Sequence, residues 1–327
     1  IEPKYAIVYN NLGIVFRELG QIHDSINSYK KAIASQPDFI EALNNLGNVL
    51  KEDGRLDDAI KFYEKAIVLK PDFADAYNNI GVVLFEMGQP GAIKFYEKAL
   101  EIEPSYAEVH NNLGNALKEI GQVDDAVISY KAAIVFESDY TDAHYNLGVI
   151  LQDLGRLQEA EMSYKTAIAL QSDYADAHYN LGILFHETGQ LEMAIKSLEM
   201  AVIINPENAE AHKYLGNTFQ SNGQVDEAIN CYEKALSIKP DHADAHRNLS
   251  TVKKYIQDDT QVILMQKLLF AGELCQSDQI HLCFALAKAY EDLGKQDDLF
   301  KVLHKGNHLR KEELNYSISQ DLDQNSN

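Results

Sequence analysis

The chain has 327 residues, of which 46% are hydrophobic, and it carries a formal net charge of -21. Nucleic acids and anionic membranes bind clustered Lys and Arg, which this sequence lacks, so its charge disfavours both and favours neutral or basic partners. Three cysteines without a Cys-x-x-Cys pair are too few for a disulfide framework. They indicate a reducing compartment and predict a cytoplasmic protein.

The dominant feature of the sequence is an internal repeat. Asn-Leu-Gly and closely related triplets recur every 34 residues, with one step of 33, from Gly13 to Gly216. Counted from seven residues before each glycine, the units begin at Ala6, Ile40, Ala74, Ala107, Thr141, Ala175 and Ala209. A related helix follows from Ala243.

The residue pattern of each unit predicts two helices. In the second unit the apolar residues follow helical periodicity on both sides of a break at Asp53-Gly54-Arg55. Small residues recur at positions 20 and 27, where two helices must approach closely, and Tyr recurs at position 24. Pro at position 32 ends most units, and the Asp after it, such as Asp72, is expected to cap the next helix. The third unit lacks one residue around Gln89-Pro90-Gly91, which should tighten one turn without interrupting the stack.

This pattern resembles the tetratricopeptide repeat (TPR) motif over residues 6 to 256, with seven units agreeing at five or more positions. The resemblance implies an all-α fold, a right-handed superhelical α-solenoid of helix-turn-helix TPR repeats. No unit can bury its apolar face alone, so neighbours stack and create a concave inner wall. In this family that wall binds peptides.

Positions 2, 6, 9 and 13 form one stripe along each first helix, away from the apolar stripe. Position 6 carries the residues that we call the groove asparagines: Asn11, Asn45, Asn79, Asn112, Asn146, Asn180 and Asn248. An Asn amide is both donor and acceptor and so complements a peptide group. The row resembles the asparagine arrays of O-GlcNAc transferases, which implies that it holds an extended peptide backbone. The alternative is that Asn merely follows the repeat consensus.

An acidic row at position 2 flanks the groove asparagines: Glu41, Asp75, Glu108, Asp142, Asp176 and Glu210. If these residues contact ligand, the groove prefers extended, neutral or basic segments. The alternative is that they only favour the helix dipole in the first turn. The clamp that binds chaperone C-terminal carboxylates needs Lys or Arg at inner positions, and only Lys213 and Arg247 offer nearby positive charge. We therefore rank that clamp low.

Histidines recur at position 4, where other units place a bulky packed residue: His110, His144, His178, His212 and His246. Adjacent helices pack roughly 8–10 Å apart, too far to share one zinc ion, so we expect core packing and no metal site. The sequence contains no Walker loop, His-Glu-x-x-His or Gly-x-Ser-x-Gly motif. We predict no catalytic residue and no cofactor.

After Lys254 the register loosens, but residues 261–270, 278–293 and 297–309 still read as helices. Segments 245–255, 284–295 and 306–317 resemble the junction before the catalytic domain of bacterial TPR sulfotransferases. The expected organisation is the end of a preceding unit (1–5), seven repeats (6–242), the first helix of an eighth (243–256), a divergent helical cap (257–313) and a disordered polar tail (314–327).

Two functions follow. The leading one is a protein-interaction scaffold that binds extended peptides in its groove. The alternative is the substrate-recruiting region of a sulfotransferase, or of an O-GlcNAc-type glycosyltransferase, whose catalytic domain is absent from this chain. Self-association is possible but is not predicted.

Overall fold

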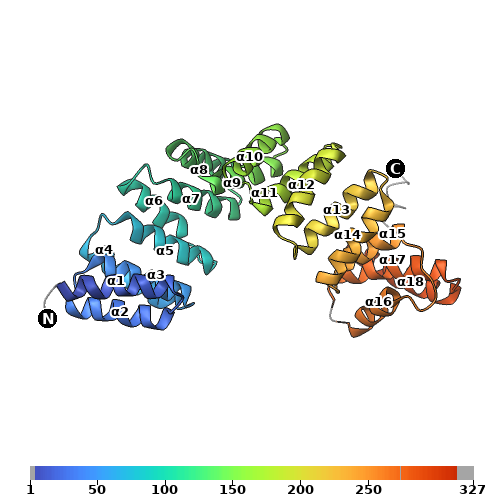
Figure 1. The fold of residues 1–327 in the computed structure, drawn as a ribbon, viewed down its shortest axis with the longest axis horizontal. Coiled ribbons are helices and arrows are strands. Elements are labelled where there is room, and N and C mark those ends of the chain that lie inside the picture. Colours follow the sequence, from blue (N-terminus) through green and yellow to red (C-terminus); the bar gives the residue numbers. More distant parts are fainter. Residues whose placement is uncertain (1–3, 273, 315–327) are drawn as a thin grey trace, which may run out of the picture. The chain divides into compact units, whose positions relative to one another are not determined.

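The computed structural model describes residues 4–272 and 274–314, and this part of the chain contains eighteen α-helices and no strand. The chain forms two compact units, an N-terminal unit (Ile1–Leu170) and a C-terminal unit (Gln171–Asn327). The N-terminal unit holds α1 (Lys4–Glu18), α2 (Ile22–Ser35), α3 (Ile40–Glu52), α4 (Leu56–Leu69), α5 (Ala74–Glu86), α6 (Ala92–Ile102), α7 (Ala107–Glu119), α8 (Val123–Phe136), α9 (Thr141–Asp153) and α10 (Leu157–Leu170) (Figure 1). The C-terminal unit holds α11 (Ala175–Glu187), α12 (Leu191–Ile204), α13 (Ala209–Ser221), α14 (Val225–Ile238), α15 (Ala243–Val252), α16 (Thr260–Ala271), α17 (Gln276–Asp292) and α18 (Gln296–Glu313).

The helices pair as the repeat predicts. In the N-terminal unit and again in the C-terminal unit, the first helix of a repeat packs against the second helix of the same repeat. That second helix packs against the first helix of the next repeat, as α1, α2 and α3 do. Every first helix from α3 to α15 begins at the predicted start of its repeat, whereas α1 begins at Lys4, two residues before Ala6. These contacts confirm the all-α solenoid of helix pairs.

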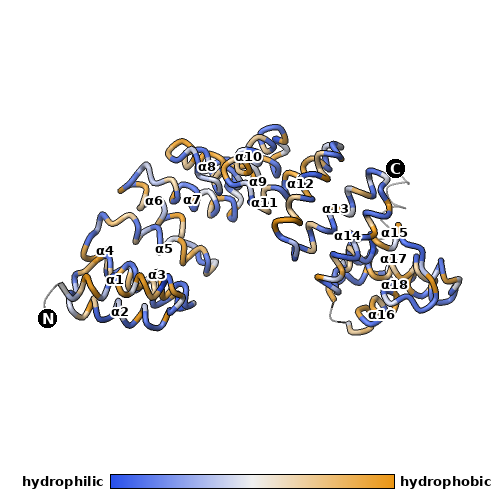
Figure 2. Tube along the Cα trace, viewed as in Figure 1, coloured by the Kyte–Doolittle hydropathy of each residue, from blue (hydrophilic) through white to orange (hydrophobic). Residues whose placement is uncertain are grey.

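The repeated glycine and tyrosine are partners in one close contact. A Cβ placed on Gly114 would lie 2.6 Å from Cε1 of Tyr130, and one on Gly148 would lie 2.6 Å from Cε1 of Tyr164. The alanines at positions 20 and 27 are almost completely buried beside these rings. Figure 2 shows hydrophobic and hydrophilic residues alternating along the helices, as amphipathic helices in a stack require. In six repeats the glycine is therefore needed because its neighbour is an aromatic ring, whereas Gly182 faces Leu198 at an equally short distance.

The turns inside each helix pair end the first helix with a glycine. Gly54 adopts a φ of 75°, its N–H donates to the carbonyl of Lys51, and the N–H of Arg55 donates to that of Leu50. This Schellman motif satisfies two carbonyls at the end of α3.

The expected Asp caps are wrong. Helix α5 begins at Ala74, so its N-cap residue is Phe73, and no side chain caps the helix. Asp72 instead lies in a tight turn with Pro71, closed by the N–H of Phe73 donating to the carbonyl of Lys70 at 3.1 Å. Pro and Asp favour turn positions for their own local reasons, so their recurrence marks the turn and not the cap.

The C-terminal cap differs from the repeats in its packing. Helix α15 ends at Val252 and not at residue 256, because Tyr255 is buried in a core with α16 and α17 and its N–H donates to Asp292. Helix α15 then packs against α17, and α17 against α18. The expected tail lies outside the described residues except for Leu314. Searched over residues 4–272 and 274–314, the structure has no helix long and apolar enough to cross a membrane.

Candidate functional site

The groove asparagines of the N-terminal unit are joined to the preceding repeat. Asn11, in the first repeat, is exposed on α1. Each of the other four donates a side-chain N–H to the side-chain oxygen of an asparagine at position 5 of the repeat before it. The pairs are Asn45 to Asn10 at 3.1 Å, Asn79 to Asn44 at 3.0 Å, Asn112 to Asn78 at 3.1 Å, and Asn146 to Asn111 at 2.9 Å. We call the position-5 residues Asn10, Asn44, Asn78 and Asn111 the anchor asparagines.

These bonds set what the groove asparagines can offer a ligand. The four bonded side chains are half-buried, and each commits one N–H to the neighbouring repeat. An Asn amide has two N–H donors and a carbonyl with two lone pairs, so hydrogen-bonding capacity for a peptide group remains. The anchor asparagines were missed by the sequence analysis, although the doubled Asn before Leu-Gly or Ile-Gly in the first four repeats signals them.

The row changes its chemistry in the C-terminal unit. Asn248 donates to the side-chain oxygen of Asn217 at 2.8 Å, and the hydroxyl of Tyr232 donates to the same oxygen at 2.8 Å. Asn180 is half-buried on α11, and Tyr214 takes the position of the groove asparagine on α13. Asn217 and Asn248 also line one open, mostly polar pocket of this unit. The partner of Asn248 is thus at position 9 and not at position 5.

Side chains of the acidic row bind other side chains of their own chain. Asp75 accepts the hydroxyl of Tyr106 at 2.9 Å, Glu108 accepts Asn78 at 3.1 Å, and Glu210 pairs with Lys213 at 2.7 Å. Glu41, Asp142 and Asp176 have exposed side chains. The contact of Glu108 with Asn78 crosses from one repeat to the next, and that of Asp75 with Tyr106 joins α5 to the turn before α7, so this row also holds helices of the stack together.

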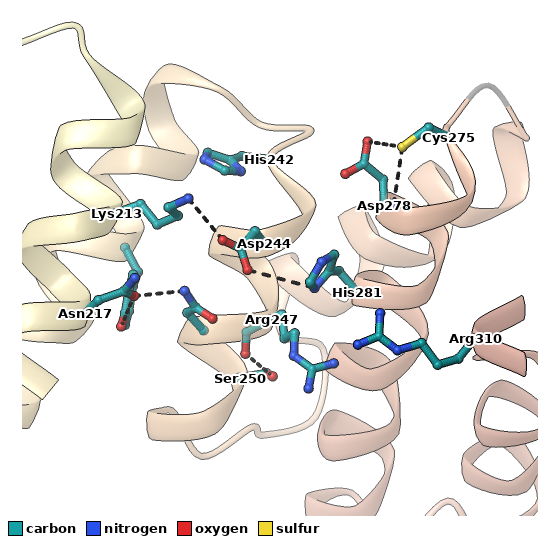
Figure 3. Close-up of polar contacts among 12 residues, drawn as sticks. Lys213, Asn217, His242, Asp244, Arg247, Ser250, Cys275, Asp278, His281 and Arg310 are labelled. Atoms are coloured by element: carbon teal, nitrogen blue, oxygen red, sulfur yellow. Dashed lines mark hydrogen bonds and ion pairs between the residues drawn. The ribbon is translucent and has the colours of Figure 1, made fainter. Parts of the chain in front are cut away.

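Lys213 forms the centre of a charged cluster in the C-terminal unit. It is buried to 8% exposure and pairs with both Glu210 and Asp244, the latter at 3.0 Å (Figure 3). Burial alone would lower the pKa of Lys213, but its hydrogen bonds to the two carboxylates outweigh burial and the pKa is raised. Nε2 of His242 lies 3.0 Å from Glu210 without the alignment of a hydrogen bond. The positive charge of Lys213 is neutralised internally and is not offered to a ligand.

Arg247 is the other cation that the sequence places beside the groove. Its guanidinium lies 5.0 Å from the ring centroid of Phe284, over the face of the ring. In Figure 3 its side chain extends from α15 toward the helices of the cap. A single arginine on an aromatic ring does not make the cluster of cations that a carboxylate clamp needs.

The position-4 histidines each make the same kind of hydrogen bond. Their Nε2 atoms lie 2.9–3.1 Å from backbone carbonyls six residues earlier, in the turn before each first helix, as with His110 and Pro104. Burial lowers the pKa of His212 and of His246. Within the described residues no group of three His, Cys, Asp or Glu side chains could hold a metal ion. The histidines tie each first helix to the turn that precedes it.

Comparison with known proteins identifies the repeat. Residues 15–54, 47–88, 89–121, 114–155 and 150–189 match the family model described as TPR repeat. Residues 175–208 and 209–242 match the model described as tetratricopeptide repeat. These matches end at residue 242, so the sulfotransferase resemblance of the later segments stays a prediction, as does the O-GlcNAc transferase resemblance of the groove asparagines. No curated protein sequence matches the chain.

Several solved structures are similar to part of the chain. MamA is 32% identical over 50% of this chain and 96% of its own, with a TM-score of 0.47. The pilF protein of Pseudomonas aeruginosa is 20% identical over 62% of this chain and 92% of its own, with a TM-score of 0.57. YrrB, described as a TPR protein with an unusual peptide-binding site, is 27% identical over 56% of this chain and 95% of its own, with a TM-score of 0.46. The family-model matches cover more than half of the chain, which therefore belongs to the tetratricopeptide repeat family of protein-interaction scaffolds.

Proposed function

We propose that this scaffold binds extended peptide segments along the groove asparagines and performs no catalysis of its own. The observation that carries the proposal is the row of four bonded Asn pairs in the N-terminal unit. A free Asn side chain must lose rotamer freedom when it binds, whereas these amides are already held by the preceding repeat. A held amide with remaining donor and acceptor capacity suits a repeating peptide backbone.

The anchor asparagines supply a matched control for the experiment. Replacing Asn79, Asn112 and Asn146 together by Ala removes three groove amides and three inter-repeat bonds. Replacing Asn44, Asn78 and Asn111 by Ala removes the same three bonds, and also the bond from Asn78 to Glu108, but keeps the groove amides. Peptides selected on the native protein from a random library would be measured against both variants by fluorescence anisotropy.

We expect the groove variant to bind at least tenfold more weakly than the native protein. The anchor variant should lose less, because its groove amides remain although the preceding repeat no longer holds them. Far-ultraviolet circular dichroism would confirm that both variants keep their helices. Equal losses in both variants would mean that the asparagines serve only to hold repeats together. In that case the proposal of a peptide-binding row would be wrong.

A second role for the same groove is to recruit the substrate of a transferase, as the sulfotransferase-like segments 245–255, 284–295 and 306–317 suggest. The two roles differ in whether a catalytic domain or a separate transferase works together with the repeats. Reading the gene beyond codon 327 separates them, because a recruiting region requires a catalytic domain encoded in the same protein or a transferase that co-purifies with it.

A further inference from the structure

The third repeat lacks a side chain that the other repeats use to fill the space at the turn. Its second helix, α6, has 11 residues, whereas α4 has 14. Elsewhere position 17 opens the second helix with an apolar residue: Ile22, Leu56, Val123, Leu157, Leu191 and Val225. Ile22 and Leu56 pack against the core of the first repeats. In the third repeat Pro90 occupies position 17 and Gly91 follows it, and both residues are exposed.

The missing side chain leaves an open cleft of about 730 Å³ between α5, α6 and α7. Its apolar walls include Phe85, Ile93, Ala116 and Ile120. Phe85 is 37% exposed and Ile120 is 57% exposed, so the cleft displays apolar surface to solvent. Exposed apolar surface that is concave and has polar neighbours is typical of a binding site. The expectation that the short repeat only tightens a turn was therefore incomplete.

Phe85 also interrupts a series of ion pairs along the stack. In the first, second and fourth repeats position 12 is basic, and its charge pairs with a carboxylate at position 13 of the next repeat. The pairs are Arg17 with Glu52, Lys51 with Glu86 at 3.9 Å, and Lys118 with Asp153 at 3.8 Å. In the third repeat position 12 is Phe85, so the corresponding carboxylate, Glu119, has no ion-pair partner among residues 4–272 and 274–314.

Glu119 lines the same cleft as Phe85. An apolar cleft and an unpaired carboxylate thus lie side by side, at the one junction where both features of the repeat are altered. A carboxylate in this position attracts the cation that its counterparts already have, and the protein's net charge of -21 adds to that preference.

We propose that this third-repeat cleft selects the ligand: it binds an apolar side chain of an extended peptide while Glu119 pairs with a Lys or Arg two residues away. Side chains two residues apart in an extended chain point to the same face, and the chain advances about 3.3 Å per residue, so both side chains reach neighbouring walls of one cleft. The inference rests on the proposed peptide-binding function and adds sequence preference to it, because the groove asparagines recognise only the backbone.

The test uses a defined peptide and methyl NMR of the full chain labelled at isoleucine. The probe is acetyl-Gly-Ser-Gly-Lys-Gly-Leu-Ser-Gly-Ser-amide, with matched peptides that carry Glu in place of Lys or Ser in place of Leu. We expect the Lys-Leu peptide to shift the Ile93 and Ile120 methyl signals and to leave Ile26 unchanged. Each matched peptide should bind at least fivefold more weakly. Absence of shifts, or equal shifts with all three peptides, overturns the proposal.

Two variants and one control complete the test. Phe85→Lys restores the consensus cation opposite Glu119, and Glu119→Gln removes the charge; both should weaken binding at least fivefold. The control, Lys118→Gln, leaves Asp153 without its cation at a junction where Val123 occupies position 17, and it should bind as the native protein does. Unchanged binding by Phe85→Lys would overturn the proposal.

Failure of this inference can be told apart from failure of the proposed function by an Asn79→Ala, Asn112→Ala variant. If that variant loses binding while Phe85→Lys does not, the groove asparagines bind peptide and the cleft inference is wrong. If Phe85→Lys loses binding while the asparagine variant does not, the cleft inference stands and the proposed role of the asparagines is wrong.

Discussion

The N-terminal and C-terminal units join neighbouring repeats with different chemistry at the same position. Position 5 carries the anchor asparagines in the N-terminal unit, whereas it carries Lys213 and Arg247 in the last two first helices of the C-terminal unit. At this position the N-terminal unit therefore uses neutral amide bonds, and the C-terminal unit uses a buried ion pair with a histidine beside it. The contact that position 5 makes between repeats is thus neutral in one unit and charged in the other.

The largest effect is expected from Lys213→Ala in the C-terminal unit. The change leaves Glu210 and Asp244 without their shared cation, and removing one partner of a buried pair costs more than the pair itself contributes. Because both carboxylates remain partly exposed, we expect the free energy of unfolding of this unit to fall by about 2–3 kcal/mol. Hydrogen exchange of the backbone amides of α13 to α15 measures this loss of stability. Unchanged exchange there would show that Lys213 contributes nothing to stability.

A second difference should appear on acidification. Burial lowers the pKa of His212, His242 and His246, all in the C-terminal unit. Folding therefore favours the neutral rings, so this stability is complete above about pH 6.5, the unfolded value, and is lost as the pH falls through the lower folded values. Between pH 7 and 5 we expect protection of α13 to α15 to fall about tenfold more than that of α5 to α9. Equal losses would contradict the comparison.

The smallest effect is expected from Asn44→Ala in the N-terminal unit. It removes one neutral hydrogen bond, from Asn79, and should lower the free energy of unfolding by about 1 kcal/mol. Because no charge is involved, the loss should be the same in roughly 0.1 M and 1 M salt, whereas the loss in Lys213→Ala should change. Urea titration at both salt concentrations measures the two variants. A salt-dependent loss in Asn44→Ala would remove the contrast between the units.

Much of the fold could be predicted because it depends on local signals. The small residues at positions 20 and 27 predict where two helices approach closely, and the break at Gly54 predicts the end of a helix. The three helices of the cap were also predicted, with ends that differ by a few residues. Asp72 was misread because Asp is favoured both in turns and at helix starts, and the sequence does not distinguish the two.

The site was predicted less completely. Helical periodicity places Asn79 and Asp75 along one stripe, but it does not show that Asn79 donates to Asn44 or that Asp75 accepts Tyr106. Nor does the loss of one residue near Pro90 reveal a cleft, because the cleft is bounded by side chains from α5 and α7 as well as α6.

The sequence by itself determined the repeat, its register, the helix pairs and the stripe that bears the groove asparagines. These follow from backbone periodicity and from turn residues, which act over a few positions. Only the tertiary structure decided which amides bond to the preceding repeat, which carboxylates are neutralised, and where Glu119 is left beside an open apolar cleft. Such contacts join residues about 30 to 35 positions apart in the chain, and their distances depend on how one repeat packs on the next.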